Sequence, residues 1–167
     1  MNADPGQTAT PLPRAMMVCD LFKGVLGREV EVATGGPMVN PGVEGGALVG
    51  IYVDRFLKLS ALMLLDLPLA ARAGAALALL PTRVAEFAIE DRLLPEALLD
   101  NASEILNVAT SLFNIGNAPH LRLDRCYAPG DPLPNDVARW VLAYVPRLDL
   151  EVDIKGYGDG VVSVILV

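Results

Sequence analysis

Residues 98–114 read LLDNASEILNVATSLFN, and this stretch decides the fold. Apolar residues recur in it every three or four positions, the spacing that places side chains on one face of an α-helix. Polar residues recur with the same spacing on the opposite face. The pattern therefore predicts one amphipathic helix that packs on a core. The apolar set is Leu98, Ala102, Ile105, Ala109 and Leu112, and the polar set is Asp100, Glu104, Asn107, Ser111 and Asn114.

The polar face of this helix lacks basic residues. No Lys or Arg occurs between Arg92 and Arg122. A solvated helix face usually mixes Glu with Lys or Arg, because opposite charges four residues apart stabilise a helix. Asn is mildly unfavourable inside a helix, because its amide competes for backbone hydrogen bonds, so a functional role would explain Asn107. We interpret the face as a binding surface, and an ordinary solvated face is the alternative.

The rest of the sequence alternates between helix-like and strand-like stretches around this helix. The composition is 53% hydrophobic, which suits helices packed closely on a sheet. We expect residues 1–13 to form a disordered tail and residues 14–167 to form a single α+β domain, with an antiparallel-rich sheet and two long helices packed on one side. Further helices are predicted over residues 15–26, 69–80, 84–90 and 135–144, and strands over residues 28–33, 47–54, 59–66, 120–127, 147–155 and 161–167.

Charge and apolar content exclude several classes of protein. The net charge of −7 argues against nucleic acid as a partner, because the phosphate backbone would repel the chain. Residues 61–80 are apolar, but Asp66 and Arg72 interrupt them, so we expect a strand end and a helix start rather than a membrane span. Cys19 and Cys126 match no metal or redox spacing, and the first residues do not form a signal peptide. A cytoplasmic protein with reduced thiols is therefore expected.

Asp100, Glu104 and Asn107 form the pattern D-x-x-x-E-x-x-N on the predicted helix. The motif lies after strands and an Ala-rich helix and before a terminal pair of strands. In both respects the sequence resembles the chemotaxis phosphatase family, the CheC/CheX/FliY group, whose members remove phosphate from the aspartyl-phosphate of CheY-type response regulators. Some family patterns add a downstream proline, and Pro129 lies twenty-two positions after Asn107, close to the expected offset.

The number of motifs distinguishes the branches of this family. CheC-like members carry two copies of the E-x-x-N motif, whereas CheX-like members carry one. Residues 69–80, the predicted helix where a second copy would lie, contain neither Glu nor Asn. The sequence is therefore most similar to the single-motif CheX-type members, and this resemblance implies a homodimer.

The resemblance also implies a role for each motif residue in hydrolysing the aspartyl-phosphate of a receiver domain. Asn107 orients the attacking water, Glu104 pairs with a receiver lysine, and Asp100 has a supporting role. Mg²⁺ is supplied by the receiver, and the protein has no cofactor of its own. A neutral amide suits the first role, because it accepts from water and donates to phosphate without adding negative charge. The alternative is a non-enzymatic module of the same fold that binds a receiver or a flagellar-switch-type partner without hydrolysis.

Other polar residues are interpreted as structural. His120 is the only histidine and has no accompanying cluster of metal-ligating residues. Residues 34–46, TGGPMVNPGVEGG, form a loop without the G-K-S/T ending of a phosphate cradle. Asp149, Glu151 and Asp153 alternate and so share one face of a strand. We expect a solvated acidic face that also protects an edge strand from self-association.

Overall fold

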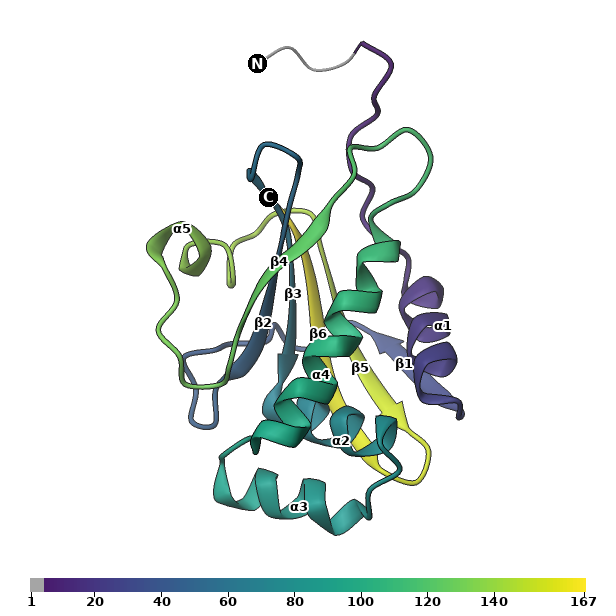
Figure 1. Ribbon diagram of the computed structural model, residues 1–167, viewed down its shortest axis with the longest axis vertical. Coiled ribbons are helices and arrows are strands. Elements are labelled where there is room, and N and C mark those ends of the chain that lie inside the picture. Colours follow the sequence, from purple (N-terminus) through teal and green to yellow (C-terminus); the bar gives the residue numbers. More distant parts are fainter. Residues whose placement is uncertain (1–4) are drawn as a thin grey trace.

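A six-stranded antiparallel sheet forms the centre of the computed structural model, which describes residues 5–167 (Figure 1). The strand order is β1-β5-β6-β3-β2-β4, so β1 and β4 are the two edges. Every neighbouring pair is antiparallel. The strands are β1 (Val30–Thr34), β2 (Ala47–Val53), β3 (Leu59–Asp66), β4 (Arg122–Tyr127), β5 (Arg147–Ile154) and β6 (Gly158–Leu166).

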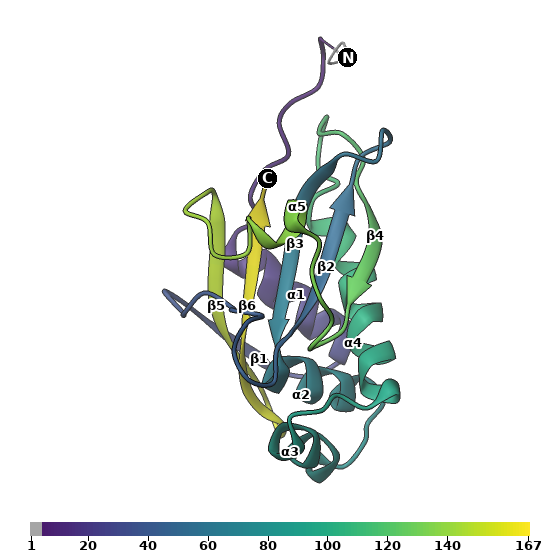
Figure 2. The ribbon, with the colours of Figure 1, turned by 90° about the vertical axis from the view of Figure 1, so that its left-hand side faces the viewer.

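Three helices cover one face of this sheet, and a further helix lies at its end (Figures 1 and 2). The predicted α+β fold is confirmed, with three helices of similar length on the covered face where two were predicted. Asp66 starts α2, because its carboxylate accepts a hydrogen bond from the Leu69 N–H at 2.9 Å. The helices are α1 (Ala15–Leu26), α2 (Leu67–Leu77), α3 (Thr82–Asp91), α4 (Glu96–Val108), the 3₁₀ turn η1 (Ala109–Leu112) and α5 (Asn135–Ala138).

The sheet has a core on each of its faces. The larger core lies under the helices, where Phe22 of α1, Leu69 of α2 and Ile105 of α4 meet side chains from the central strands. On the opposite face, Val137 and Val141 pack with residues of β2 and β3. Both faces of β2 and β3 are therefore buried, which explains their continuous apolar sequences.

Two predicted helices end earlier than their sequence patterns indicate. The helix expected over residues 135–144 is helical only through Ala138. Beyond it, the N–H groups of Trp140, Val141 and Ala143 bond to carbonyls three residues back, so this segment forms turns. The guanidinium of Arg147 donates to the carbonyls of Val141 and Ala143, at 3.1 and 3.0 Å, and joins these turns to β5. The helix expected to run to Asn114 changes to 3₁₀ winding after Val108.

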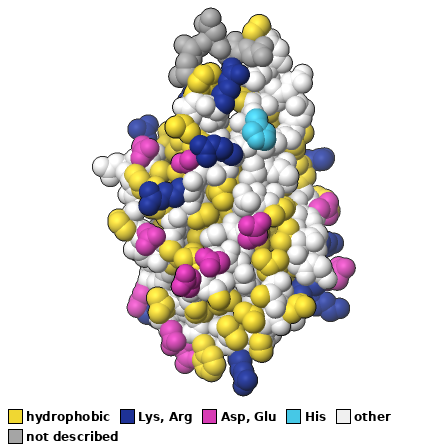
Figure 3. Space-filling model, viewed as in Figure 1, with side chains coloured by type: hydrophobic (Ala, Val, Ile, Leu, Met, Phe, Trp, Pro, Cys, Tyr) yellow, Lys and Arg dark blue, Asp and Glu magenta, His cyan; other side chains and the backbone are white. Residues whose placement is uncertain are grey.

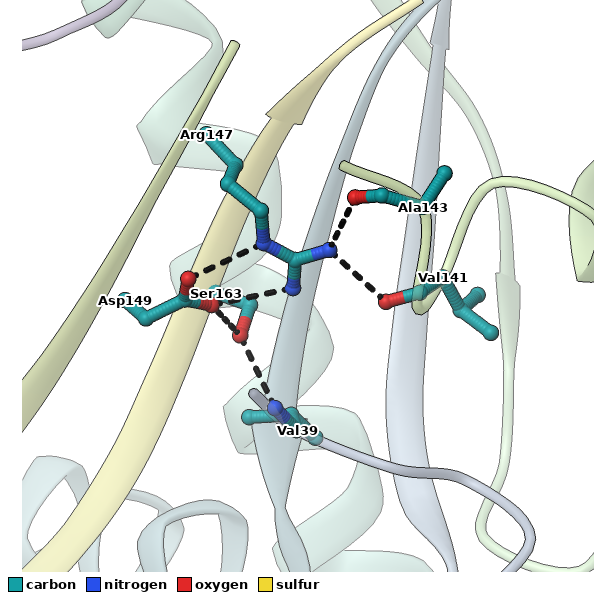
Figure 4. Close-up of polar contacts among 6 residues, drawn as sticks. All are labelled: Val39, Val141, Ala143, Arg147, Asp149 and Ser163. Carbon is teal, nitrogen blue, oxygen red and sulfur yellow. Dashed lines mark hydrogen bonds and ion pairs between the residues drawn. The ribbon is translucent and has the colours of Figure 1, made fainter. Parts of the chain in front are cut away.

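β5 is not an edge strand, and one of its three acidic residues is not solvated, so the prediction for this strand is wrong on these two points. β5 lies between β1 and β6, and Asp149 is largely buried in a polar network (Figure 4). Arg147 and Asp149 form a two-point ion pair with N–O distances of 2.9 Å. Ser163 donates to Asp149 at 2.5 Å and accepts from the Val39 N–H at 3.0 Å. The network ties three segments together on the second face of the sheet. Glu151 and Asp153 are exposed, as predicted.

Part of the predicted N-terminal tail lies outside the described residues, namely residues 1–4. Residues 5–13 form neither helix nor strand, and at their end Pro13 is buried and Leu12 packs on the larger core. Residues 61–80 divide between β3 and α2, as expected from their interruptions. Within residues 5–167, the helices are all too short or too polar to cross a membrane.

Candidate functional site

The helix α4 carries the motif, and its apolar face is embedded in the core. The predicted apolar set is buried throughout, with Leu98, Ala102, Ile105, Ala109 and Leu112 no more than 4% exposed. Burying five such side chains contributes several kcal/mol, at roughly 25 cal/mol per Å² of apolar surface removed from water. The opposite face of α4 is thereby fixed toward solvent.

Two glycines let α4 approach its neighbours closely. A Cβ on Gly74 of α2 would lie 2.7 Å from the carbonyl oxygen of Leu98, and a Cβ on Gly50 of β2 would lie 3.0 Å from Cδ1 of Leu106. Asn101 adds a polar link, because its side-chain amide donates to the Gly74 carbonyl at 3.0 Å. The helix is thus fixed against both α2 and the sheet.

A buried tyrosine fixes the C-terminal half of α4. The phenol of Tyr52 in β2 donates to the carbonyl of Leu106 at 2.6 Å, and its ring packs on Phe113 with a centroid distance of 4.8 Å. Burial raises the pKa of Tyr52 well above its ordinary value, so the phenol remains protonated and keeps its donor. The sequence contains a signal for this contact, because a tyrosine inside a buried strand needs a partner for its hydroxyl.

The structure places Asp100, Glu104 and Asn107 together on the exposed face of α4. Residues three and four apart on a helix have Cβ atoms about 5–6 Å apart, so the three side chains form one continuous strip. Among residues 5–167, no hydrogen bond or ion pair engages any of these three side chains. Figure 3 shows the same side of the molecule, with acidic and apolar side chains interspersed over its lower half.

The end of the predicted polar face has a structural role instead. Asn114 is half-buried, and its amide both donates to the Leu121 carbonyl at 2.9 Å and accepts from the Leu121 N–H at 2.8 Å. These contacts pin the loop that leads into β4. Ser111 is exposed, and its hydroxyl donates to the carbonyl of Val108 at 3.1 Å.

The thiol of Cys126 in the edge strand β4 lies beside Ser103 of α4. Cys126 of β4 is half-buried, and burial raises its pKa above the ordinary thiol value, with an opposing contribution from the Ser103 hydroxyl of α4. Pro129, the candidate downstream proline, follows β4 and lies against Gly46, where an added Cβ would be 3.2 Å from its Cα. His120 is exposed in the loop before β4.

The site offers a carboxylate and a neutral amide but no cluster of metal ligands. Within the described part of the chain, no group of three or more His, Cys, Asp or Glu residues is arranged to hold a metal ion. The exposed strip can therefore accept hydrogen bonds from a cation through Glu104 and both donate and accept through Asn107.

Comparison with known proteins identifies the fold through structure alone. No protein-family model matches the sequence, and no curated protein matches it either. The middle domain of FliM from H. pylori superimposes with a TM-score of 0.58 at 10% identity, covering 91% of this chain and 84% of that chain. A chain of the FliM–SpeE complex from H. pylori gives 0.55 at 9% identity, with 91% and 80% covered.

A chain of the CheX–CheY–BeF₃–Mg²⁺ complex from Borrelia burgdorferi has a TM-score of 0.48 at 12% identity, with 88% of this chain and 90% of that chain covered. The likeness to the FliM domains extends over nine-tenths of the sequence. The chain therefore has the fold of the FliM middle domain.

Proposed function

We propose that this protein is a phosphatase of the CheX type that hydrolyses the aspartyl-phosphate of a CheY-type receiver domain. The observation that carries the proposal is the strip of Asp100, Glu104 and Asn107, exposed and without partners among residues 5–167, on a helix that the sheet and α2 hold in place. The backbone of a helix fixed in this way needs no further ordering on docking, so only the rotamers of the three side chains are restricted.

The chemistry requires little from the protein itself. A phosphorylated receiver already holds Mg²⁺ and a lysine beside its aspartyl-phosphate, and hydrolysis needs a water in line with the phosphorus. Asn107 accepts a hydrogen bond from that water, whose oxygen attacks phosphorus while the bond to the aspartate oxygen breaks. The aspartate leaves as a carboxylate, and the proton of the water goes to the released phosphate. Positioning of this kind supplies several kcal/mol of barrier lowering.

Glu104 serves docking rather than the bond-breaking step. Its carboxylate is exposed and free to pair with the receiver lysine, and α4 and η1 contain no basic residue that would compete for it. Asp100, one turn earlier, adds negative charge to the same face and supports the approach of a basic surface. Mg²⁺ remains a ligand of the receiver.

The proposal is tested by the lifetime of aspartyl-phosphate on candidate receivers, with this protein present at substoichiometric concentration. The wild type is expected to shorten the lifetime, and Asn107→Ala is expected to lose most of that activity while it folds normally. Asn117→Ala is the matched control, because Asn117 is an exposed asparagine outside α4. Full activity of Asn107→Ala would refute the mechanism.

A second candidate function is a module that binds a receiver or a switch-type partner without hydrolysis. The comparison that favours it is the likeness to the FliM middle domain, which occurs in complexes with FliG and with SpeE. Binding to a phosphorylated receiver with an unchanged phosphate lifetime would support this function over the first. A homodimer is part of the first proposal, and sedimentation equilibrium tests it. A cytoplasmic location follows from the proposed substrate.

A further inference from the structure

The backbone around Asn107 is held from two sides by side-chain hydroxyls. Tyr52 donates to the carbonyl of Leu106, the residue before Asn107, at 2.6 Å. Thr110 donates to the carbonyl of Asn107 itself at 2.7 Å. Tyr52 is 0% exposed, whereas Thr110 lies at the surface, so the first contact comes from the sheet and the second from the helix.

These two hydrogen bonds fall where the helix changes its winding. α4 ends at Val108 and η1 begins at Ala109. An α-helix turns about 100° per residue and a 3₁₀ helix about 120°, so the position of the change sets the direction of the side chains around it. A shift of the change by one residue would rotate Asn107 relative to Glu104 and to the sheet.

The geometry points to Tyr52 and Thr110 as positioning residues for Asn107, which fix the α-to-3₁₀ change beside it and thereby aim its amide. The inference deepens the phosphatase function proposed above and rests on it. Both hydroxyls are engaged with the helix backbone, that of Tyr52 in the core and that of Thr110 on the Asn107 carbonyl, so neither is offered to a receiver.

If the two hydroxyls aim the Asn107 amide, removing either one should lower kcat and leave KM unchanged. Docking depends on the outer surface of α4, which neither hydroxyl joins, so KM should be retained. The in-line water depends on the direction of the Asn107 amide, and a displacement of about 1 Å at a reacting centre costs roughly 100-fold in rate. Removing one of the two hydroxyls should displace the Asn107 amide by less than about 1 Å, so we expect kcat to fall about tenfold.

Tyr157 provides a matched control for the removal of the Tyr52 hydroxyl. Its phenol also donates to a backbone carbonyl, that of Leu80, at 2.7 Å. Tyr157 lies in the turn between β5 and β6, outside α4 and η1. Tyr52→Phe and Tyr157→Phe therefore remove the same chemical group and the same kind of hydrogen bond at two places.

The experiment measures steady-state dephosphorylation of a receiver, with melting curves and the backbone amide NMR spectrum of each variant. Tyr52→Phe and Thr110→Val are expected to lower kcat about tenfold with KM within twofold, and to shift the Asn107 amide resonances. Tyr157→Phe is expected to leave kcat, KM and the Asn107 amide resonances unchanged. Thr110→Val keeps the test valid if Tyr52→Phe does not fold, because Thr110 is at the surface.

The outcomes separate this inference from the proposed function. Wild-type kcat in Thr110→Val and in any folded Tyr52→Phe, in a protein whose Asn107→Ala variant is inactive, would overturn the positioning inference and leave the phosphatase intact. An equal loss of kcat in Tyr157→Phe would also overturn it, because the effect would then be a general loss of stability. A wild type inactive on every receiver would refute the phosphatase function and this inference together.

Discussion

Gly74 and Gly24 lie inside helices, and the structure predicts opposite effects of the same substitution at the two positions. In α2, a Cβ on Gly74 would be 2.7 Å from the Leu98 carbonyl oxygen and 3.3 Å from Leu98 Cα, both atoms of the α4 backbone. In α1, a Cβ on Gly24 would meet no atom within 4 Å. Replacing each glycine with alanine therefore isolates the close approach of α2 and α4.

The size of each effect follows from two opposing contributions. Alanine is favoured over glycine inside a helix by about 1 kcal/mol. At Gly74 the added methyl group forces the two helices apart, and overpacking costs about 1–3 kcal/mol. The Asn101 hydrogen bond to the Gly74 carbonyl, worth about 1 kcal/mol, is strained by the same movement. Gly74→Ala should therefore destabilise the protein by about 1–3 kcal/mol, and Gly24→Ala should stabilise it by about 0.5–1 kcal/mol.

Urea unfolding at constant pH measures both variants against the wild type. The unfolding midpoint should move down for Gly74→Ala and up for Gly24→Ala, with similar slopes. Melting temperatures should follow, by about 2–4 °C per kcal/mol for a chain of this size. If Gly74→Ala were as stable as Gly24→Ala, the close packing of α2 on α4 described here would be refuted.

Three further predictions concern the buried network, the cap of α2 and the docking face. Asp149→Ala should lower the free energy of unfolding by about 3–5 kcal/mol, because it leaves the guanidinium of Arg147, only 7% exposed, without its anion. The double variant Arg147→Met/Asp149→Leu should be less destabilised in urea unfolding, and a larger loss in the double variant would contradict the network. Burial raises the pKa of Asp66 in the folded state above the ordinary value of 3.8. As the pH rises above 3.8, the unfolded state loses the carboxyl proton before the folded state does, so the contribution of Asp66 to the stability of the fold decreases. Asp66→Asn keeps the cap, so its stability relative to the wild type, measured by urea unfolding, should increase as the pH rises above about 4. A stability difference that does not change with pH would contradict the raised pKa of Asp66. Glu104→Ala should raise KM for the phosphorylated receiver more than it lowers kcat and should weaken the salt dependence of docking, whereas an unchanged KM would remove Glu104 from the docking contact.

Local patterns were enough to predict most elements. The helix expected over residues 15–26 has those limits in the structure, because Gly27 adopts a left-handed conformation that ends it. The hairpin of β2 and β3 also follows from two apolar runs and a short polar link. The short α5 was not predictable in this way, because the turns that follow Ala138 are joined to Arg147 of β5, a contact that only the tertiary structure provides.

The position of β5 illustrates a second limit of the sequence. Its alternating acids are typical of an edge strand, but β1 from the start of the chain pairs with it along five residues. That pairing joins segments more than a hundred residues apart, and no local pattern specifies it. Asp149 is buried for another reason, because its carboxylate bonds to Arg147 of β5 and Ser163 of β6 on the second face of the sheet.

The exposed strip of the candidate site could be predicted, but its supports could not. Helical spacing alone places Asp100, Glu104 and Asn107 on one face. The hydrogen bond from Tyr52 and the close approaches at Gly50 and Gly74 depend on how α4 lies on the sheet. Two residues of β2 were signals that such supports exist: Gly50, because a glycine inside a strand marks a close backbone approach, and Tyr52, because its buried hydroxyl needs a partner.

The most direct test of the proposed function is the decay of aspartyl-phosphate on receiver domains from the same genome, measured with wild-type protein and with Asn107→Ala side by side. Catalytic shortening of the lifetime by the wild type, lost in Asn107→Ala and retained in Asn117→Ala, is the predicted result. If Asn107→Ala shortens the lifetime as well as the wild type does, or if no receiver responds to the wild type, the assignment of Asn107 to the hydrolysis of a receiver phosphate is contradicted.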